Sequence, residues 1–157
     1  MITVTLTPLE LDVAKMVGEF RCKESYRLQL DGTSKRDPSR THEEIGIQGA
    51  SGELAFCKGM NLYWLPTVNT FKAPDIGENI EIKTTDYSNG HLLISYSSLK
   101  LEVTYVLVIR KSNVFTIVGW MQGFHINSEK YFRKEDNSFW VPQSDLNTNL
   151  NEIEYRA

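Results

Sequence analysis

The sequence predicts an α+β fold with a mainly antiparallel, mixed sheet, and two observations support this prediction. Apolar residues recur with the helical period from Pro8 to Tyr26 and again from Thr41 to Gly59. After residue 78, short runs rich in β-branched and aromatic residues are separated by turn-forming residues. Helices that come first and strands that follow favour N-terminal helices packed on a sheet of this kind.

Both predicted helices carry start signals. Thr7 is a favourable N-cap residue for the first helix. Thr41 and Glu44, three residues apart, form a capping box for the second helix, and Gly59 ends it. The polar segment 31–40 is dense in turn-forming residues, so we expect a connector within one domain rather than a domain boundary.

The second half of the chain is expected to contain the strands. The segment 61–74 contains two prolines and is expected to be irregular. One short helical turn is expected within 123–138 and another in the polar tail 143–157, with a last short strand beginning at Phe139. The four main strands, with turns at "SNG" and "KSN", are predicted at Asn79–Thr85, His91–Tyr96, Val103–Arg110 and Val114–Met121.

Length and composition indicate one globular domain. The chain has 157 residues, 41% hydrophobic and 24% charged, and we expect a single domain over residues 1–157. No apolar run approaches the roughly 20 residues of a membrane helix, and the N-terminal segment lacks the layout of a secretory signal. Cys22 and Cys57 make neither a disulfide framework nor a clustered metal-ligand set. We therefore expect a reducing, cytoplasmic setting and no membrane partner.

The net charge of −3 limits the functions that the chain can have. Proteins that coat nucleic acid without sequence preference need clustered lysine and arginine to bind phosphates, and this composition argues against such a protein. An enzyme that acts on nucleic acid through an acidic metal site is still compatible with the charge.

An unusual group of charges lies in the segment 73–85, "APDIGENIEIKTT". Side chains alternate across a strand, so Glu81 and Lys83 share one face while Ile80 and Ile82 share the other. A buried sheet face usually excludes charges, so these residues lie either on a solvated face or in a site.

Asp75 joins the Glu81 face if a three-residue loop lets Ile76 pair with Ile80. We expect the left-handed residue of this loop at Asn79, because asparagine is among the few non-glycine residues that tolerate that conformation. Cross-strand neighbours are about 4.5–5.5 Å apart, so the carboxylates of Asp75 and Glu81 can share one cation.

This arrangement suits metal-assisted chemistry. Two carboxylates at that distance raise each other's pKa unless a cation lies between them. Mg²⁺ is a hard ion that proteins hold with one or two carboxylates, water and substrate phosphate. Lys83, two residues from Glu81 on the same face, can hold or deprotonate a nucleophilic water. The chemistry predicted is metal-assisted hydrolysis of a phosphodiester. A structural hairpin with a solvated charged face is the alternative that these residues leave open.

The second predicted helix has a stripe of small residues that contains one acid. Gly46, Gly49, Glu53 and Cys57 follow one another at spacings of three and four residues. Each glycine inside a helix costs about 1 kcal/mol relative to alanine, a loss that is tolerable where the backbone must approach another element closely. If that element is the sheet, Glu53 is directed at the charged face of the hairpin. Otherwise Glu53 is a solvated helix residue.

These residues resemble the motif of the PD-(D/E)XK nuclease superfamily. Pro74-Asp75 followed by Glu81-Ile82-Lys83 is almost the literal motif. Glu53 on the preceding helix is similar to the arrangement in Holliday-junction resolvases and several phage endonucleases of the superfamily. The resemblance covers about residues 41–110 and implies a restriction-endonuclease-like core.

The resemblance also implies an activity and roles for the site residues. It implies a Mg²⁺-dependent endonuclease that hydrolyses DNA, with Mn²⁺ as a substitute. In this interpretation Asp75, Glu81 and the Ile82 carbonyl are metal ligands, and Glu53 is an additional or second-metal ligand. Lys83 then serves the attacking water.

Two alternatives to the nuclease remain open, a non-catalytic DNA-binding or protein-interaction module of the same fold and a structural hairpin without a site. A homodimer is a further expectation, because one site per chain meets one strand and cutting both strands favours a two-fold pair. The first predicted helix is the expected contact between the two copies.

Overall fold

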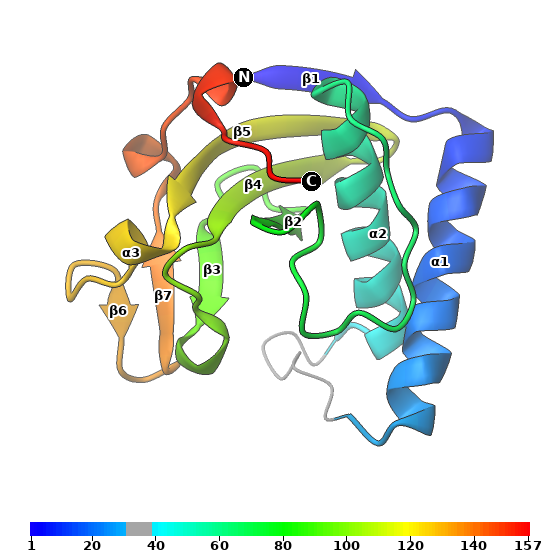
Figure 1. Ribbon diagram of the computed structural model, residues 1–157, viewed down its shortest axis with the longest axis horizontal. Coiled ribbons are helices and arrows are strands. Elements are labelled where there is room, and N and C mark those ends of the chain that lie inside the picture. Colours follow the sequence, from blue (N-terminus) through cyan, green and yellow to red (C-terminus); the bar gives the residue numbers. More distant parts are fainter. Residues whose placement is uncertain (31–38) are drawn as a thin grey trace.

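The computed structural model describes residues 1–30 and 39–157. Two long helices, α1 (Pro8–Arg27) and α2 (His42–Gly59), lie side by side at one end of the molecule (Figure 1). A third helix, α3 (Gly123–Ile126), is a single turn. Further 3₁₀ turns occupy Tyr96–Ser98, Gln143–Asp145 and Leu150–Glu152. No helix in these described ranges has both the length and the apolar character needed to cross a membrane.

A four-stranded sheet lies beside the long helices. Its strand order is β1 (Ile2–Thr5), β5 (Val114–Gln122), β4 (Thr104–Lys111) and β2 (Ile80–Thr85). The β1–β5 and β4–β5 pairs are antiparallel, whereas β2 runs parallel to β4. The α+β class with a mainly antiparallel, mixed sheet and N-terminal helices packed on it is therefore confirmed.

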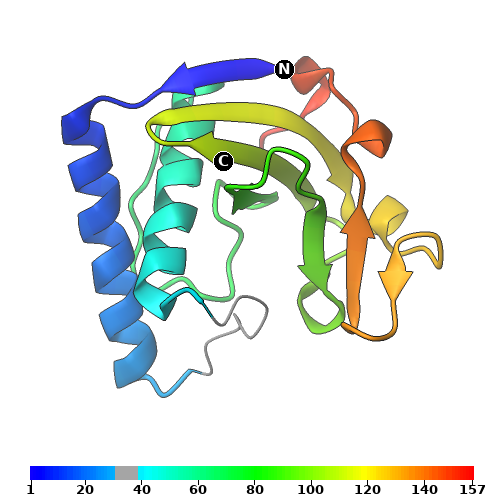
Figure 2. The ribbon, with the colours of Figure 1, turned by 180° about the vertical axis from the view of Figure 1, so that it is seen from behind.

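A second, three-stranded sheet lies on the other side of the molecule from the long helices, as the reverse view also shows (Figure 2). It consists of β3 (Leu92–Ser95), β7 (Ser138–Val141) and β6 (Phe132–Arg133), all antiparallel. The short strand expected from Phe139 is β7, and it is the central strand of this sheet.

Two apolar clusters hold these layers together, one on each face of the four-stranded sheet. On the helix side, Ile80 and Ile82 of β2 pack with Phe56 of α2. On the other side, Leu107 of β4 packs with Phe139 of the second sheet. Successive side chains of a strand point to opposite faces of the sheet, so the residues that alternate with Ile80 and Ile82 face away from α2.

The local signals in the sequence produce the expected local structure. Thr7 and Thr41 each accept a hydrogen bond from the backbone N–H three residues on, and both capping boxes are complete. The predicted "KSN" turn joins β4 to β5, with Ser112 at φ 57°. Glycine, asparagine and serine in turns thus mark the ends of these strands correctly.

Several predicted details are wrong or untested. The strand β1 was not predicted, because four residues of alternating character at a chain end carry little signal. The "SNG" turn is present, but it leads into the second sheet, and β2 pairs with β4 instead of with the strand that follows it. Most of the expected connector 31–40 lies outside the described residues.

Candidate active site

The hairpin that carries the predicted site forms as expected at its apolar pair. Ile76 and Ile80 form an antiparallel bridge, with N–H···O distances of 3.0 and 3.2 Å in the two directions. The left-handed residue is Gly77, at φ 57°, and not Asn79 as predicted. A glycine takes this conformation at the lowest cost, so the first loop residue adopts it.

Asn79 has a different role, because it fixes the hairpin to the C-terminal tail. Its buried side-chain amide donates to the carbonyl of Glu154 at 2.7 Å and accepts from the N–H of Arg156 at 3.0 Å. A Cβ atom on Gly77 would lie 2.0 Å from the carbonyl oxygen of Arg156. The loop and the tail therefore fit closely, and the tail holds the loop in place.

Asp75 lies at the open edge of the sheet, beside β2. Its Oδ2 accepts a hydrogen bond of 2.8 Å from the N–H of Ile82, which turns this part of the β2 backbone toward the carboxylate. Burial raises the pKa of Asp75 well above its usual range, and the negative charges of Glu53 and Glu81 raise it further. The charge of Lys83 and the Ile82 hydrogen bond oppose this shift only in part.

Glu81 and Lys83 are on the face of β2 that is turned away from α2. Their side chains form an ion pair at 2.9 Å and are 24% and 34% exposed. Burial alone would lower the pKa of Lys83, but the charges of Glu81 and Asp75 outweigh it and raise that pKa. Lys83 is therefore a cation that can be reached by solvent, next to two carboxylates.

Glu53 approaches Asp75 from the other side. It is 3% exposed, and its carboxylate accepts two hydrogen bonds from the guanidinium of Arg21, at 2.5 and 2.9 Å. The indole N–H of Trp64 donates a third, at 3.3 Å. Because α2 packs on the face of β2 opposite to Glu81, the expectation that Glu53 points at the Glu81 face is wrong. Its carboxylate is held by Arg21 and Trp64, near enough to Asp75 for its charge to raise the pKa of that residue.

The glycines of α2 do not act as predicted. Gly46 contacts Gly18 of α1, not the sheet, and no atom lies within 4 Å of a Cβ built on Gly49. The glycine that allows α2 to approach the sheet is Gly52, whose Cβ would lie 1.8 Å from Oγ1 of Thr84 in β2. The helix–sheet contact therefore depends on a glycine outside the predicted stripe, at the position just before Glu53.

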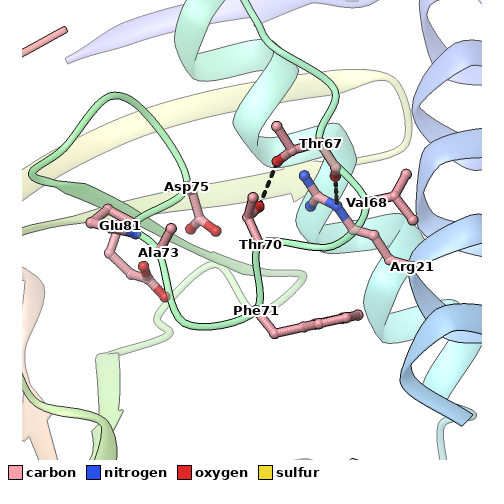
Figure 3. A pocket seen from close by; sticks show the side chains of 9 residues that line it. Arg21, Thr67, Val68, Thr70, Phe71, Ala73, Asp75 and Glu81 are labelled. Atoms are coloured by element: carbon pink, nitrogen blue, oxygen red, sulfur yellow. Dashed lines mark hydrogen bonds between the residues drawn. The ribbon is translucent and has the colours of Figure 1, made fainter. Parts of the chain in front are cut away.

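Asp75, Glu81 and Arg21 line one pocket of about 100 Å³. The rest of its wall comes from the irregular segment after α2, including Thr67, Val68, Thr70 and Phe71, with Ala73 and Pro74. Figure 3 shows the Asp75 carboxylate and the Arg21 guanidinium directed toward this space from opposite sides. The predicted irregular segment 61–74 thus forms the mouth of the site.

Arg21 is the site residue that the sequence analysis missed. It lies three residues after Gly18 and seven after Ala14, both of which are buried, so helical spacing places it on the inner face of α1. An arginine at a buried helix position is rare without a partner, and this was the signal in the sequence. Its partner, 32 residues away along the chain, could not be identified locally.

The carboxylate oxygens in the pocket meet part of what Mg²⁺ needs as ligands. Two carboxylates, Asp75 and Glu81, face the pocket, and Mg²⁺ commonly takes one or two carboxylates from a protein with water filling the other positions. The repulsion that raises the pKa of Asp75 is the repulsion that a cation would relieve. Glu53 is occupied by Arg21, and in residues 1–30 and 39–157 no three His, Cys, Asp or Glu side chains lie together as a ready metal site.

Comparisons with known proteins give no match to a family model, a curated protein or a solved structure.

Proposed function

We propose that this protein is a Mg²⁺-dependent endonuclease that hydrolyses phosphodiester bonds in DNA. The observation that carries the proposal is that the Asp75 and Glu81 carboxylates line one pocket at the open edge of the sheet, with Lys83 paired to Glu81. Burial and the charges of two neighbouring carboxylates raise the pKa of Asp75 there. Perturbed acids in a pocket are typical of sites that bind a cation or transfer a proton. The resemblance of Pro74-Asp75 and Glu81-Ile82-Lys83 to the PD-(D/E)XK motif supports the same chemistry.

Asp75 and Glu81 would hold the metal, with the Ile82 carbonyl as a further oxygen ligand. The N–H of Ile82 already faces Asp75, and the N–H and C=O of one strand residue point to the same side. When bound, Mg²⁺ would supply Lewis-acid stabilisation of the charge that develops on the phosphate. Mn²⁺ has the same preference for oxygen ligands and is the expected substitute.

Lys83 is the residue proposed to handle the nucleophilic water. Its ammonium group is held 2.9 Å from Glu81, which lines the pocket, and the side chain is a third exposed, so water can reach it. An ammonium beside the reacting phosphate also stabilises negative charge there. The nuclease interpretation therefore assigns binding of the metal to Asp75 and Glu81 and handling of water to Lys83.

The alternative is a non-catalytic DNA-binding or protein-interaction module of the same fold. One observation favours it, namely that Glu53 and Glu81 already have cationic partners in Arg21 and Lys83. A site whose charges are satisfied internally needs no metal for stability. Cleavage assays decide between the two functions.

The test of the proposed function is incubation with branched, duplex and single-stranded DNA in Mg²⁺, Mn²⁺, Ca²⁺ or EDTA. We expect cleavage with Mg²⁺ and Mn²⁺, and poor cleavage with Ca²⁺, which is larger and has a looser coordination geometry. Asp75→Ala and Glu81→Ala should abolish cleavage, whereas Glu78→Ala, an exposed acid in the same hairpin loop, should not. Equal products in EDTA would exclude the metal mechanism.

We also propose that two copies pair through α1. Its outer face exposes Leu9, Met16 and Phe20, at helical spacing and opposite the face that packs on α2. Asp12 and Lys23 flank this stripe on the same side, toward its two ends. In an antiparallel pair each would lie near the other residue of the second copy, and this charge complementarity favours a two-fold dimer.

A further inference from the structure

The pocket beside Asp75 contains groups that the proposed hydrolysis does not use. Arg21, Thr67, Thr70 and Phe71 form the wall opposite the acidic residues. They come from α1 and from the irregular segment after α2, and all are part of the same opening (Figure 3). A wall with a cation, hydroxyl groups and an aromatic ring next to a hydrolytic site has the composition of a nucleotide-binding surface.

Arg21 is held rigidly and still has donors to offer. Its Nε–H donates to the carbonyl of Thr67 at 2.8 Å, and one N–H of each terminal nitrogen donates to Glu53. A guanidinium has five N–H groups, so two of them have no partner within the described part of the chain. The two remaining N–H groups lie on different edges of the guanidinium, one on each terminal nitrogen, and each can donate one charge-assisted hydrogen bond to a phosphate oxygen.

Glu53 is the group that positions Arg21. Its carboxylate is buried, and it accepts from both terminal nitrogens, so the guanidinium cannot rotate freely. The negative charges of Glu53 and Asp75 also raise the pKa of Arg21, although burial alone would lower it. The arginine is thus permanently charged and fixed in direction at the wall of the pocket.

Phe71 is an aromatic side chain at the mouth of the same pocket, and it is 43% exposed. Thr67 and Thr70, whose hydroxyl groups are 2.7 Å apart, keep this part of the segment folded back toward Arg21. An exposed ring beside a phosphate-binding group offers a surface on which a base can stack. Paired bases in a duplex are stacked already, so only an unpaired base is available to such a ring.

We infer that this pocket is a nucleotide subsite, in which Arg21 binds a backbone phosphate and Phe71 stacks on an unpaired base. The inference rests on the proposed function, and it deepens it by naming the substrate class as single-stranded DNA or DNA with an unpaired stretch. It also gives Glu53 a role in positioning Arg21 instead of a place among the metal ligands.

The experiment compares binding of a fluorescent single-stranded oligonucleotide and of a blunt duplex, in Ca²⁺, by anisotropy at several salt concentrations. The phosphate arm uses Glu53→Gln and the double variant Arg21→Gln/Glu53→Gln, which removes both charges and leaves no unpaired buried carboxylate. The stacking arm uses Phe71→Leu and Phe71→Trp. Phe124→Leu, another exposed phenylalanine but outside the pocket, is the matched control.

We expect the double variant to lose about tenfold or more in affinity relative to Glu53→Gln. The slope of the logarithm of the binding constant against the logarithm of the salt concentration should become shallower by about 0.7, the value for one phosphate on a single strand. Phe71→Leu should lose about 5- to 150-fold for the single strand and little for the duplex, since stacking on one base is worth that range. Phe71→Trp, which keeps an aromatic face for stacking, should recover most of the single-strand affinity that Phe71→Leu loses. Phe124→Leu should bind like the wild type. Thermal unfolding checks that each variant is folded.

Two results would overturn the inference. One is a double variant that binds the single strand as Glu53→Gln does, with an unchanged salt slope. The other is a loss on Phe71→Leu that is the same for duplex and single strand. The role of Glu53 is tested separately by calorimetric titration with Mn²⁺, and loss of Mn²⁺ binding in Glu53→Gln would return Glu53 to the metal ligands. Failure of the proposed function is a separate outcome, in which the wild type binds the oligonucleotide through Arg21 and Phe71 but cleaves no DNA with Mg²⁺ or Mn²⁺.

Discussion

Substitution of Lys83 tests its proposed role in catalysis separately from metal binding by Asp75 and Glu81. Lys83→Ala removes the ammonium group proposed to handle the attacking water, but it leaves Asp75 and Glu81 in place for the metal. Acid–base assistance of this kind contributes about 10²–10⁴-fold in rate, which corresponds to about 3–5 kcal/mol in the activation free energy. We expect single-turnover cleavage to slow by that factor, with Mn²⁺ binding retained.

The same substitution should hardly change the stability of the fold. Lys83 makes one ion pair, at 2.9 Å to Glu81, and the two side chains are 34% and 24% exposed, so solvent screens much of the interaction. Pairs of this exposure contribute about 0–1 kcal/mol to the free energy of unfolding. Lys83 also opposes the raised pKa of Asp75, so its loss should move the acidic limb of the pH–rate profile to higher pH.

Cleavage and stability are measured on Lys83→Ala, on wild type and on Lys134→Ala, which removes an exposed lysine outside the pocket. Manganese binding is followed by isothermal calorimetry. Cleavage of Lys83→Ala at the wild-type rate would refute the role of this lysine. Loss of Mn²⁺ binding together with activity would show that Lys83 maintains the metal site and has no separate part in the chemistry.

Four further predictions concern the fold and its assembly. Asp75→Asn should raise the melting temperature in metal-free buffer at pH 7. The pKa of Asp75 is higher in the folded state than its ordinary value of 3.8, so the wild type loses stability as the pH rises from 3.8 through the folded-state pKa. The gain in melting temperature should vanish in acid, and a variant less stable than the wild type at pH 7 would contradict the assignment of strain to this carboxylate. Gly18→Ala should lower the free energy of unfolding by about 1–3 kcal/mol, since its Cβ would lie 2.5 Å from the Cα of Ile47. Gly49→Ala, which meets no atom within 4 Å, should raise it by up to about 1 kcal/mol in the same urea titration. Phe20→Glu should convert the proposed dimer to a monomer in light scattering without lowering the melting temperature of the monomer, and a wild type that is already monomeric at high concentration would exclude pairing through α1.

The parts of the fold that the sequence predicted are those that form within a few residues. Both helices begin at capping boxes, in which the partners are three residues apart, so the signal and the structure lie in the same short stretch. The Ile76–Ile80 bridge follows from a loop of three residues in the same way. The segment that carries Asp75, Glu81 and Lys83 could therefore be selected from the sequence as the candidate site.

Tertiary packing decided the rest. The parallel pairing of β2 with β4, the closure of the hairpin by Asn79 and the tail, and the pairing of Arg21 with Glu53 join residues from 24 to 77 positions apart. Helical period shows that Arg21 is on an inner face, but not which acid it meets, because each buried charge can be satisfied by any partner that the packing brings near. The sequence alone thus determined which residues form the hairpin, and the packing of α1 and α2 on the sheet decided that Glu53 holds an arginine at the wall of the pocket.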